Sequence, residues 1–454
     1  MIDRIIGLLR RKFVRDTLTL QAGKVGVLAM SLAASVIVPV LMGPTTYGQW
    51  QLVVSLYGIW QFLNLTGAIV SAQTRLAAAV GANDTNEVLN IIAVAARLTL
   101  LYCLASTVLL WAASLLLPLA DWLYNGDPTV IQLAILLTLA QPTELLYRLV
   151  IVTFSSRRQM RHVAAMQNIN QFIFVSATII GVIVRPLPST LVFARLVYSL
   201  LTITIILVLY QRTRHHAQMT YPSLFRIART LPTASSAGYW RFGLANALDK
   251  NVGNLFNYLP VQMAGALAGP AAAGYVGLAL NAAGQQAFFT AAILDNMQAV
   301  VPQSVGRGDY ARLWRNFRKV LLVLAAGGAV FFGGFALLAP YVVPLLGEDW
   351  LPVIPLLQAL AVFGVVVTVG GVFGPLYRAF DYVRGAFLIK VATLTVGLPI
   401  GFWLVTQFGA LGAAWLTNLL YGASVALTIA LTLPELRRRA HQQHAPTNQK
   451  TPSH

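Results

Sequence analysis

Long apolar segments recur along the whole chain and are separated by short polar stretches. We predict twelve membrane spans, most of them near the roughly 20 residues that a helix needs to cross a bilayer. They are residues 17–42, 48–72, 91–117, 129–153, 164–184, 187–210, 241–264, 271–298, 320–344, 351–377, 385–406 and 409–433. Only helices and closed barrels satisfy their backbone polar groups in lipid, so this pattern predicts an all-α membrane protein.

The composition excludes an ordinary soluble domain. Hydrophobic residues make up 57% of the 454 positions and charged residues only 10%, whereas soluble domains carry about a quarter charged residues. The formal charge of +18 would suggest nucleic acid in a soluble protein. Here almost all basic residues outside the spans fall on one side of the predicted topology, and Arg185 is on the other. This asymmetry predicts cytoplasmic amino and carboxyl termini and no nucleic-acid partner.

The predicted spans divide into two halves of six. The inner connection at residues 211–240 falls at the midpoint and is predicted to be a cytoplasmic linker between six-helix bundles at 17–210 and 241–433. Residues 1–16 are basic and amphipathic, which predicts an interfacial cytoplasmic helix, and residues 434–454 are polar and predict a disordered cytoplasmic tail. With a single cysteine, Cys103, and six histidines in loops or the tail, we expect no metal or other cofactor.

An internal repeat relates the two halves. GPTTYG at residues 43–48 and GPAAAG at 269–274 both follow the first span of a half, at an offset of 226, and the same offset carries Lys24 onto Lys250. VGAND (80–84) corresponds to VGRGD (305–309), and NGDPTVIQL (125–133) to GEDWLPVIPL (347–356). Three matches in order predict a duplication, with both copies in the same orientation and a central cavity between the two bundles.

Three of these stretches carry a family resemblance: LMGPTTYGQWQLVVSLYGI, ALAGPAAAGYVGLAL and LLGEDWLPVIPLLQALA. With them the chain resembles bacterial polysaccharide transporters, the O-antigen flippase-type members of the multidrug/oligosaccharidyl-lipid/polysaccharide exporter superfamily. The resemblance implies a flippase of the bacterial inner membrane. Its substrate would be a polyprenyl-diphosphate-linked oligosaccharide, carried by alternating access from the cytoplasmic to the periplasmic leaflet for surface polysaccharide synthesis. It also implies contact with membrane lipid and polysaccharide assembly proteins; the repeat makes a monomer sufficient.

Charged residues inside the spans are the candidate site, because a charge at mid-bilayer needs a wet cavity or a partner. Lys24 and Lys250 lie deep in the first span of each half and Asn254 and Asn257 share the helix face of Lys250, which predicts a wall that binds a diphosphate or an acidic sugar. The alternative is that the lysines snorkel to the inner surface. The remaining substrate-binding candidates are Arg148 and Arg195.

Two carboxylates are candidates for ion coupling, with H⁺ or Na⁺ as the coupling ion. Glu144 lies four residues before Arg148, a spacing that predicts an ion pair within one helix. Asp249 points about 100° away from Lys250 and would either pair with a cation on another helix or take part in coupling.

Two other functions are alternatives to a flippase. A cation-coupled multidrug antiporter binds organic cations and favours acidic or aromatic walls, which the excess of cations in the spans opposes. A membrane-embedded glycan polymerase or ligase would need acid–base groups in a sizeable outer loop, and the predicted outer loops are short. We therefore predict a transporter and no enzyme.

Overall fold

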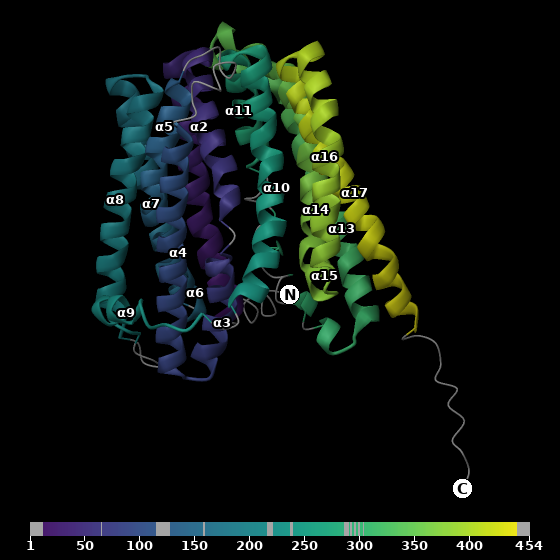
Figure 1. The fold of residues 1–454 in the computed structure, drawn as a ribbon. Helices are drawn as coiled ribbons and strands as arrows, with labels where there is room; N and C mark the ends of the chain where they lie inside the picture. Colours follow the sequence, from purple (N-terminus) through teal and green to yellow (C-terminus); the bar gives the residue numbers. More distant parts are fainter. Residues whose placement is uncertain are drawn as a thin grey trace, which may run out of the picture.

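The computed structural model describes residues 12–64, 66–114, 128–157, 159–215, 221–236, 239–285 and 304–442, and between 285 and 304 only 290, 293, 294, 297 and 300–302. All regular structure in these residues is helical. Figure 1 shows two upright groups of helices side by side, one from each half of the chain.

The amino-terminal half begins with α2 (Lys12–Trp60), a 49-residue helix with a kink at Gly43. A short helix η1 (Gln61–Leu63) and α3 (Ala68–Gly81) complete its second pass. The remaining passes are α4 (Thr85–Ser114), α5 (Thr129–Leu137) with η4 (Thr138–Ala140) and α6 (Gln141–Ser156), α7 (Met160–Val184) and α8 (Pro188–Thr213). A seven-residue helix, α9 (Leu224–Thr230), lies in the connection between the halves.

The carboxyl-terminal half repeats this order. It contains α10 (Tyr239–Ala268), α11 (Pro270–Ala283), α13 (Tyr310–Val342), η5 (Val343–Leu346) and η6 (Glu348–Trp350). These are followed by α14 (Val353–Gly371), α15 (Phe373–Ala379), α16 (Val383–Phe408) and α17 (Ala410–Gln442). In α13 and α16 many large apolar side chains face outward, as expected for helices that contact lipid.

The described helices account for the twelve predicted passes. Within the described residues, nine helical stretches are long and apolar enough to cross a membrane, and one of them, Val25–Leu63, makes two passes because it reverses at Gly43. The other two passes are α10, which has polar residues along its length, and α11, which leads into residues described only in part.

Three predicted boundaries are wrong. The span at 48–72 is broken, because helix α2 ends at Trp60 and the chain turns through Gly67, at φ +54°, before α3. No helix end separates 12–16 from the first pass. The segment predicted as a disordered tail is helical as far as Gln442. Its Leu436 and Ala440 side chains are buried, and Glu435 forms an ion pair with Arg439 one turn later. Residues 1–11 and 443–454 lie outside the described residues.

The hydrophobic core shows where the two halves meet. One cluster of buried side chains includes Val38, Met42 and Tyr47 from the first half together with Ala273, Val276 and Trp350 from the second. Two further clusters are separate: one contains only residues between 68 and 234, and the other only residues between 293 and 436. Their helices α3, α9 and α15 lie toward the lower end in Figure 1. The bundles therefore share their main core at the end of the Gly43 turn, and each has its own cluster at the end with the basic connections. Between these ends, Phe62 of the first half packs against a small cluster of the second half that contains Val252 and Phe256.

The two copies of the repeated Gly-Pro motif touch each other in this shared core. Gly43 and Gly269 both have positive φ, +70° and +90°, so each can reverse the chain before the proline that starts the next helix. A Cβ at Gly48 would lie 1.7 Å from the carbonyl oxygen of Pro270, and a Cβ at Gly274 would lie 2.4 Å from that of Pro44. The contact is reciprocal, which supports the predicted duplication.

Candidate functional site

Two polar cavities lie side by side among the helices of the first half, and one of them also borders α11 of the second half. One, of about 260 Å³, is lined from α2, α7, α8 and α11, and the other, of about 250 Å³, from α6, α7 and α8. Both are lined by Gln171, Phe174 and Arg195, so the two cavities are adjacent, and together we call them the amide chamber. Its polar lining residues are Ser31, Ser35, Tyr47, Gln51, Glu144, Tyr147, Arg148, Asn170, Gln171, Thr178, Arg195, Tyr198, Asn281 and Gln285.

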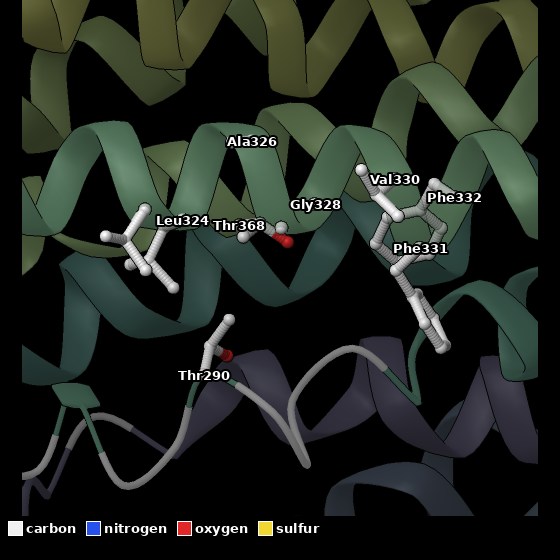
Figure 2. Close-up of a pocket in the computed structure, with 10 residues that line it drawn as sticks. Thr290, Leu324, Ala326, Gly328, Val330, Phe331, Phe332 and Thr368 are labelled. Carbon is white, nitrogen blue, oxygen red and sulfur yellow. The ribbon is translucent and has the colours of Figure 1, made fainter.

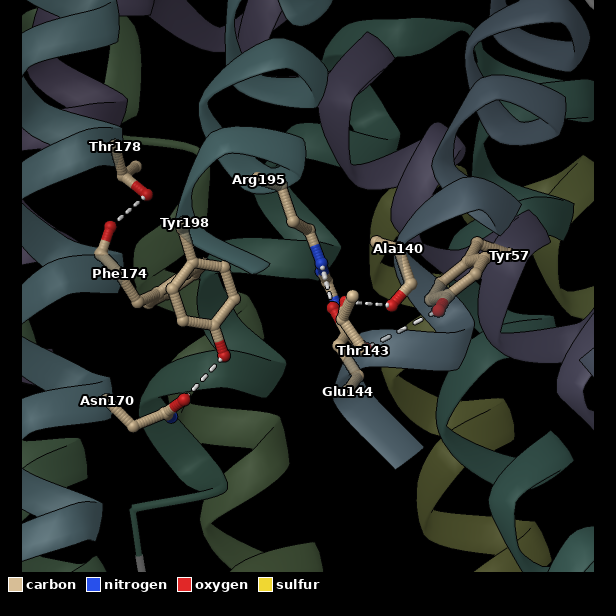
Figure 3. A network of polar contacts seen from close by, with 9 residues as sticks. All are labelled: Tyr57, Ala140, Thr143, Glu144, Asn170, Phe174, Thr178, Arg195 and Tyr198. Carbon is tan, nitrogen blue, oxygen red and sulfur yellow. Dashed lines mark hydrogen bonds and ion pairs between the residues drawn. The ribbon is translucent and has the colours of Figure 1, made fainter. Parts of the chain in front are cut away.

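Glu144 and Arg195 form an ion pair at the wall of this chamber (Figure 3). Arg195 Nε lies 2.9 Å from Glu144 Oε1 and Arg195 Nη2 lies 3.3 Å from Oε2, a two-point contact between α8 and α6. The hydroxyl of Tyr57 donates to the same carboxylate at 3.4 Å. The predicted pair between Glu144 and Arg148 is therefore wrong. Arg195 on the neighbouring helix offers a planar fork that matches the carboxylate, and Arg148 stays exposed.

Arg148 instead belongs to a group of cations at the edge of the chamber. Lys250 on α10 and Arg378 on α15 are exposed side chains, and Arg148 and Arg378 both lie close enough to Lys250 to repel its charge. We call Arg148, Lys250 and Arg378 the cationic cluster. None of the three has an ion-pair partner among the described residues. Lys250 is about 16 Å along α10 from its first residue, at 1.5 Å per residue.

Asp249, next to Lys250 in sequence, has a different environment. Its side chain is buried, and Lys390 of α16 reaches it with Nζ 2.6 Å from Oδ1 and 3.0 Å from the backbone oxygen. Tyr377 of α15 donates to Oδ2 at 2.8 Å. Both carboxylate oxygens are therefore occupied, and the group ties three helices of the second half together.

The other predicted site residues have varied positions. Asn257 is exposed and accepts a hydrogen bond from Tyr421 of α17 at 2.8 Å, while Asn254 is half-buried on the same helix. The side chain of Lys24 lies outside the described residues. Arg195 lines the chamber with its charge neutralised by Glu144.

Sequence reasoning missed several residues at this site. Arg378 is one of them, because the predicted span at 351–377 ends one residue before it and leaves it outside the charges counted within spans. The chamber amides Gln51, Asn170, Gln171, Asn281 and Gln285 carry no charge and gave no motif. Their presence inside apolar helices was the available signal, because an amide in a span needs a polar partner or a wet cavity.

A larger cavity, of about 560 Å³, lies against α13 and has a different character (Figure 2). Apart from Thr290 and Thr368 its lining is apolar, with Leu324, Phe331 and Phe332 among its members. Among the described residues, no titratable side chain lines it. Its mostly apolar lining suits hydrocarbon better than a charged substrate, so we place the candidate site at the amide chamber and the cationic cluster.

We expect Glu144→Ala to destabilise the protein by about 1.5–3 kcal/mol, because Arg195 loses both contacts of its charge-assisted pair. Glu144→Gln, which keeps an acceptor for Arg195 and Tyr57, should lose less. Thermal survival of the detergent-solubilised protein measures both. Equal survival of Glu144→Ala and the unmodified protein would show that the pair contributes nothing to stability.

Comparison with known proteins supports the architecture. No family model and no curated protein matches the chain. Solved structures do, over almost their whole length. The chain is similar to an inward-facing multidrug resistance MATE family transporter of the MOP superfamily, with 15% identity, a TM-score of 0.65, and coverage of 92% of this chain and 96% of that one.

Two further structures show the same likeness. The eukaryotic MATE transporter AtDTX14 has 14% identity and a TM-score of 0.67, with 95% of this chain and 99% of that one covered. An outward-facing multidrug resistance MATE family transporter has 14% identity and a TM-score of 0.66, with 94% and 96% covered. At this level of identity the likeness establishes the fold, which confirms the prediction of an all-α membrane protein with twelve helices in two bundles of six.

Proposed function

We propose that the protein is a membrane transporter that works by alternating access and moves a polyprenyl-diphosphate-linked oligosaccharide between leaflets. The fold supports transport, because two like-oriented bundles that share a core at one end can rock about it. The observation that carries the substrate class is the cationic cluster: three cations from both halves, without carboxylate partners in the described part of the chain, next to a polar chamber. A diphosphate supplies the compact negative charge that this wall lacks.

The proposal includes a simple sequence of events for this substrate. The cores are separate at the end that carries the basic connections, so the headgroup enters between the bundles there. Lys250 and Arg378 from the second half and Arg148 from the first hold the diphosphate, while the prenyl chain stays in lipid. Arg148, Lys250 and Arg378 repel one another, and the bound diphosphate neutralises that repulsion. The two halves then come together at this end, and the shared core opens to the opposite side.

We expect Lys250→Ala, Arg148→Ala and Arg378→Ala each to reduce export at least about tenfold, since each removes one charged contact to a diphosphate. Lys250→Arg should retain part of the activity. The assay is the amount of surface polysaccharide in the native host, with lipid-linked glycan on the cytoplasmic face as the complementary measure. Arg226→Ala on α9, an exposed cation outside the cavity, is the matched control. If the Lys250→Ala variant exports as much polysaccharide as the unmodified protein, the proposed role of the cationic cluster is wrong.

A multidrug antiporter is the alternative that the names of the structural neighbours bring in. The single carboxylate that lines the amide chamber, Glu144, is already paired with Arg195, so a cationic drug finds no free counter-charge in the described lining. Protection of cells against ethidium by this protein, lost in Glu144→Gln, would favour the antiporter.

The proposal also includes coupling of transport to H⁺ or Na⁺ through Glu144 or Asp249. It places the protein in the bacterial inner membrane, with polysaccharide assembly proteins as its partners.

A further inference from the structure

The amide chamber has a chemistry distinct from that of the cationic cluster beside it. Gln171 donates from Nε2 to Ser31 Oγ at 2.9 Å, Asn281 donates from Nδ2 to Tyr47 at 3.3 Å, and Tyr198 donates to Asn170 Oδ1 at 3.0 Å. Each amide is thus held by one end. The other ends, Gln171 Oε1, Asn281 Oδ1 and Asn170 Nδ2, have no protein partner among the described residues and are not closed off in the core.

Amides fixed in this way present both acceptors and donors to whatever enters the chamber. Gln171 and Asn170 line the chamber from α7 and Asn281 lines it from α11, and an amide offers each kind of bond in a fixed direction. The aromatic residues Trp50 and Phe174 line the same space. A few convergent polar groups among aromatic walls are what orients a small polar ligand in a protein cavity.

The part of the chamber away from Arg148 has no unpaired charge in its described lining. Glu144 and Arg195 neutralise each other in a two-point pair, and Arg148 lies where the chamber meets the cationic cluster. An acidic sugar placed beyond that edge, near Gln51, Asn281 and Gln285, would meet no free cation in the described lining. Leaving a carboxylate without a partner in such a site is costly, whereas hydroxyl and acetamido groups match the amides.

We propose that the amide chamber binds uncharged sugar units, rich in hydroxyl or acetamido groups, of the transported glycan. This assignment rests on the proposed function, since the adjacent cationic cluster takes the diphosphate to which such a sugar is linked. It divides recognition in two: the sugars lie between α2, α7, α8 and α11, and the diphosphate lies at Arg148, Lys250 and Arg378.

The test uses the full-length protein in detergent and soluble probes. Saturation-transfer-difference NMR reports weak binding of maltotetraose and chitotetraose as neutral sugars and of trisialic acid as an acidic one, while calorimetry reports binding of farnesyl diphosphate. We expect the neutral sugars to bind and trisialic acid to bind at least tenfold more weakly. Gln171→Leu and Asn281→Leu should each weaken neutral-sugar binding about tenfold and leave farnesyl diphosphate binding unchanged.

Matched variants keep the outcomes distinct. Gln358→Leu, an exposed amide on α14 outside the chamber, should bind both kinds of probe normally. Lys250→Ala should weaken farnesyl diphosphate binding alone. The inference is overturned if neither neutral sugar binds, if trisialic acid binds as well as they do, or if Gln171→Leu and Asn281→Leu bind them as the unmodified protein does. The proposed function fails separately, if farnesyl diphosphate does not bind or is unaffected by Lys250→Ala.

Discussion

Gly48→Ala is expected to disrupt the joint between the two bundles and to abolish export. The added Cβ would lie 1.7 Å from the oxygen and 2.6 Å from the carbon of the Pro270 carbonyl. Both atoms belong to backbone, so no side chain can turn aside, and α11 must shift against α2. Overpacking in a tight core costs about 1–3 kcal/mol and more where the neighbours are rigid. Thermal survival of the solubilised protein and surface polysaccharide in cells measure the two effects.

A glycine elsewhere on the molecule provides the control. Gly333 on α13 has no neighbouring atom within 4 Å of an added Cβ. Gly333→Ala should therefore be neutral or stabilising by up to about 1 kcal/mol, because alanine has the higher helix propensity. Gly274→Ala, on the reciprocal contact with Pro44, should resemble Gly48→Ala. If Gly48→Ala melts and exports like Gly333→Ala, the bundles do not depend on this close approach.

Lys390→Met is expected to destabilise the second half by about 3–5 kcal/mol. The Asp249 carboxylate is buried, and removing the ammonium leaves it with Tyr377 as its single charge-stabilising partner among the described contacts. The substituted side chain fills a similar volume, so the loss comes from the charge. Yield of folded protein and its thermal survival in detergent provide the measurement.

The double variant Asp249→Asn with Lys390→Met separates charge from packing. The amide still accepts the Tyr377 hydrogen bond, and no unpaired charge remains, so most of the lost stability should return. A double variant no more stable than Lys390→Met would refute the ion-pair explanation. If the recovered protein still exports glycan, Asp249 has a structural role, and if it is stable but inactive, Asp249 takes part in coupling.

The fold was predictable because its signals are local. Apolar run length places the helices, and two Gly-Pro turns at the same offset reveal the duplication. Helix ends that depend on tertiary packing were harder to predict from the sequence. The extension of α17 to Gln442 requires Leu436 to be buried in a cluster with Phe317 and Phe373 from distant segments, which no local pattern shows. The break after Trp60 likewise depends on Asn251 of α10, which donates to the oxygens of Phe62 and Asn64.

The site was predictable as a set of charges and poorly predictable as a set of contacts. Counting cations in the spans selected Lys250 and Arg148 together with Arg195, yet the partner of Glu144 proved to be Arg195, 51 positions away, in place of Arg148. Sequence spacing fixes neighbours along one helix and says nothing of which helix packs alongside. The amides of the chamber were missed for the same reason, because their common feature is a shared space.

The reciprocal glycine contact also determines how far the two bundles can move at their other end. Because the helices touch backbone to backbone at one end, each bundle can rotate as a rigid body about that contact. A 30-residue helix such as α10 is about 45 Å long, so a turn of roughly 10° at the contact sweeps its far tip through about 8 Å. If the protein transports by alternating access as proposed, a small rotation at the glycines is therefore enough to open or close the far end of the cavity.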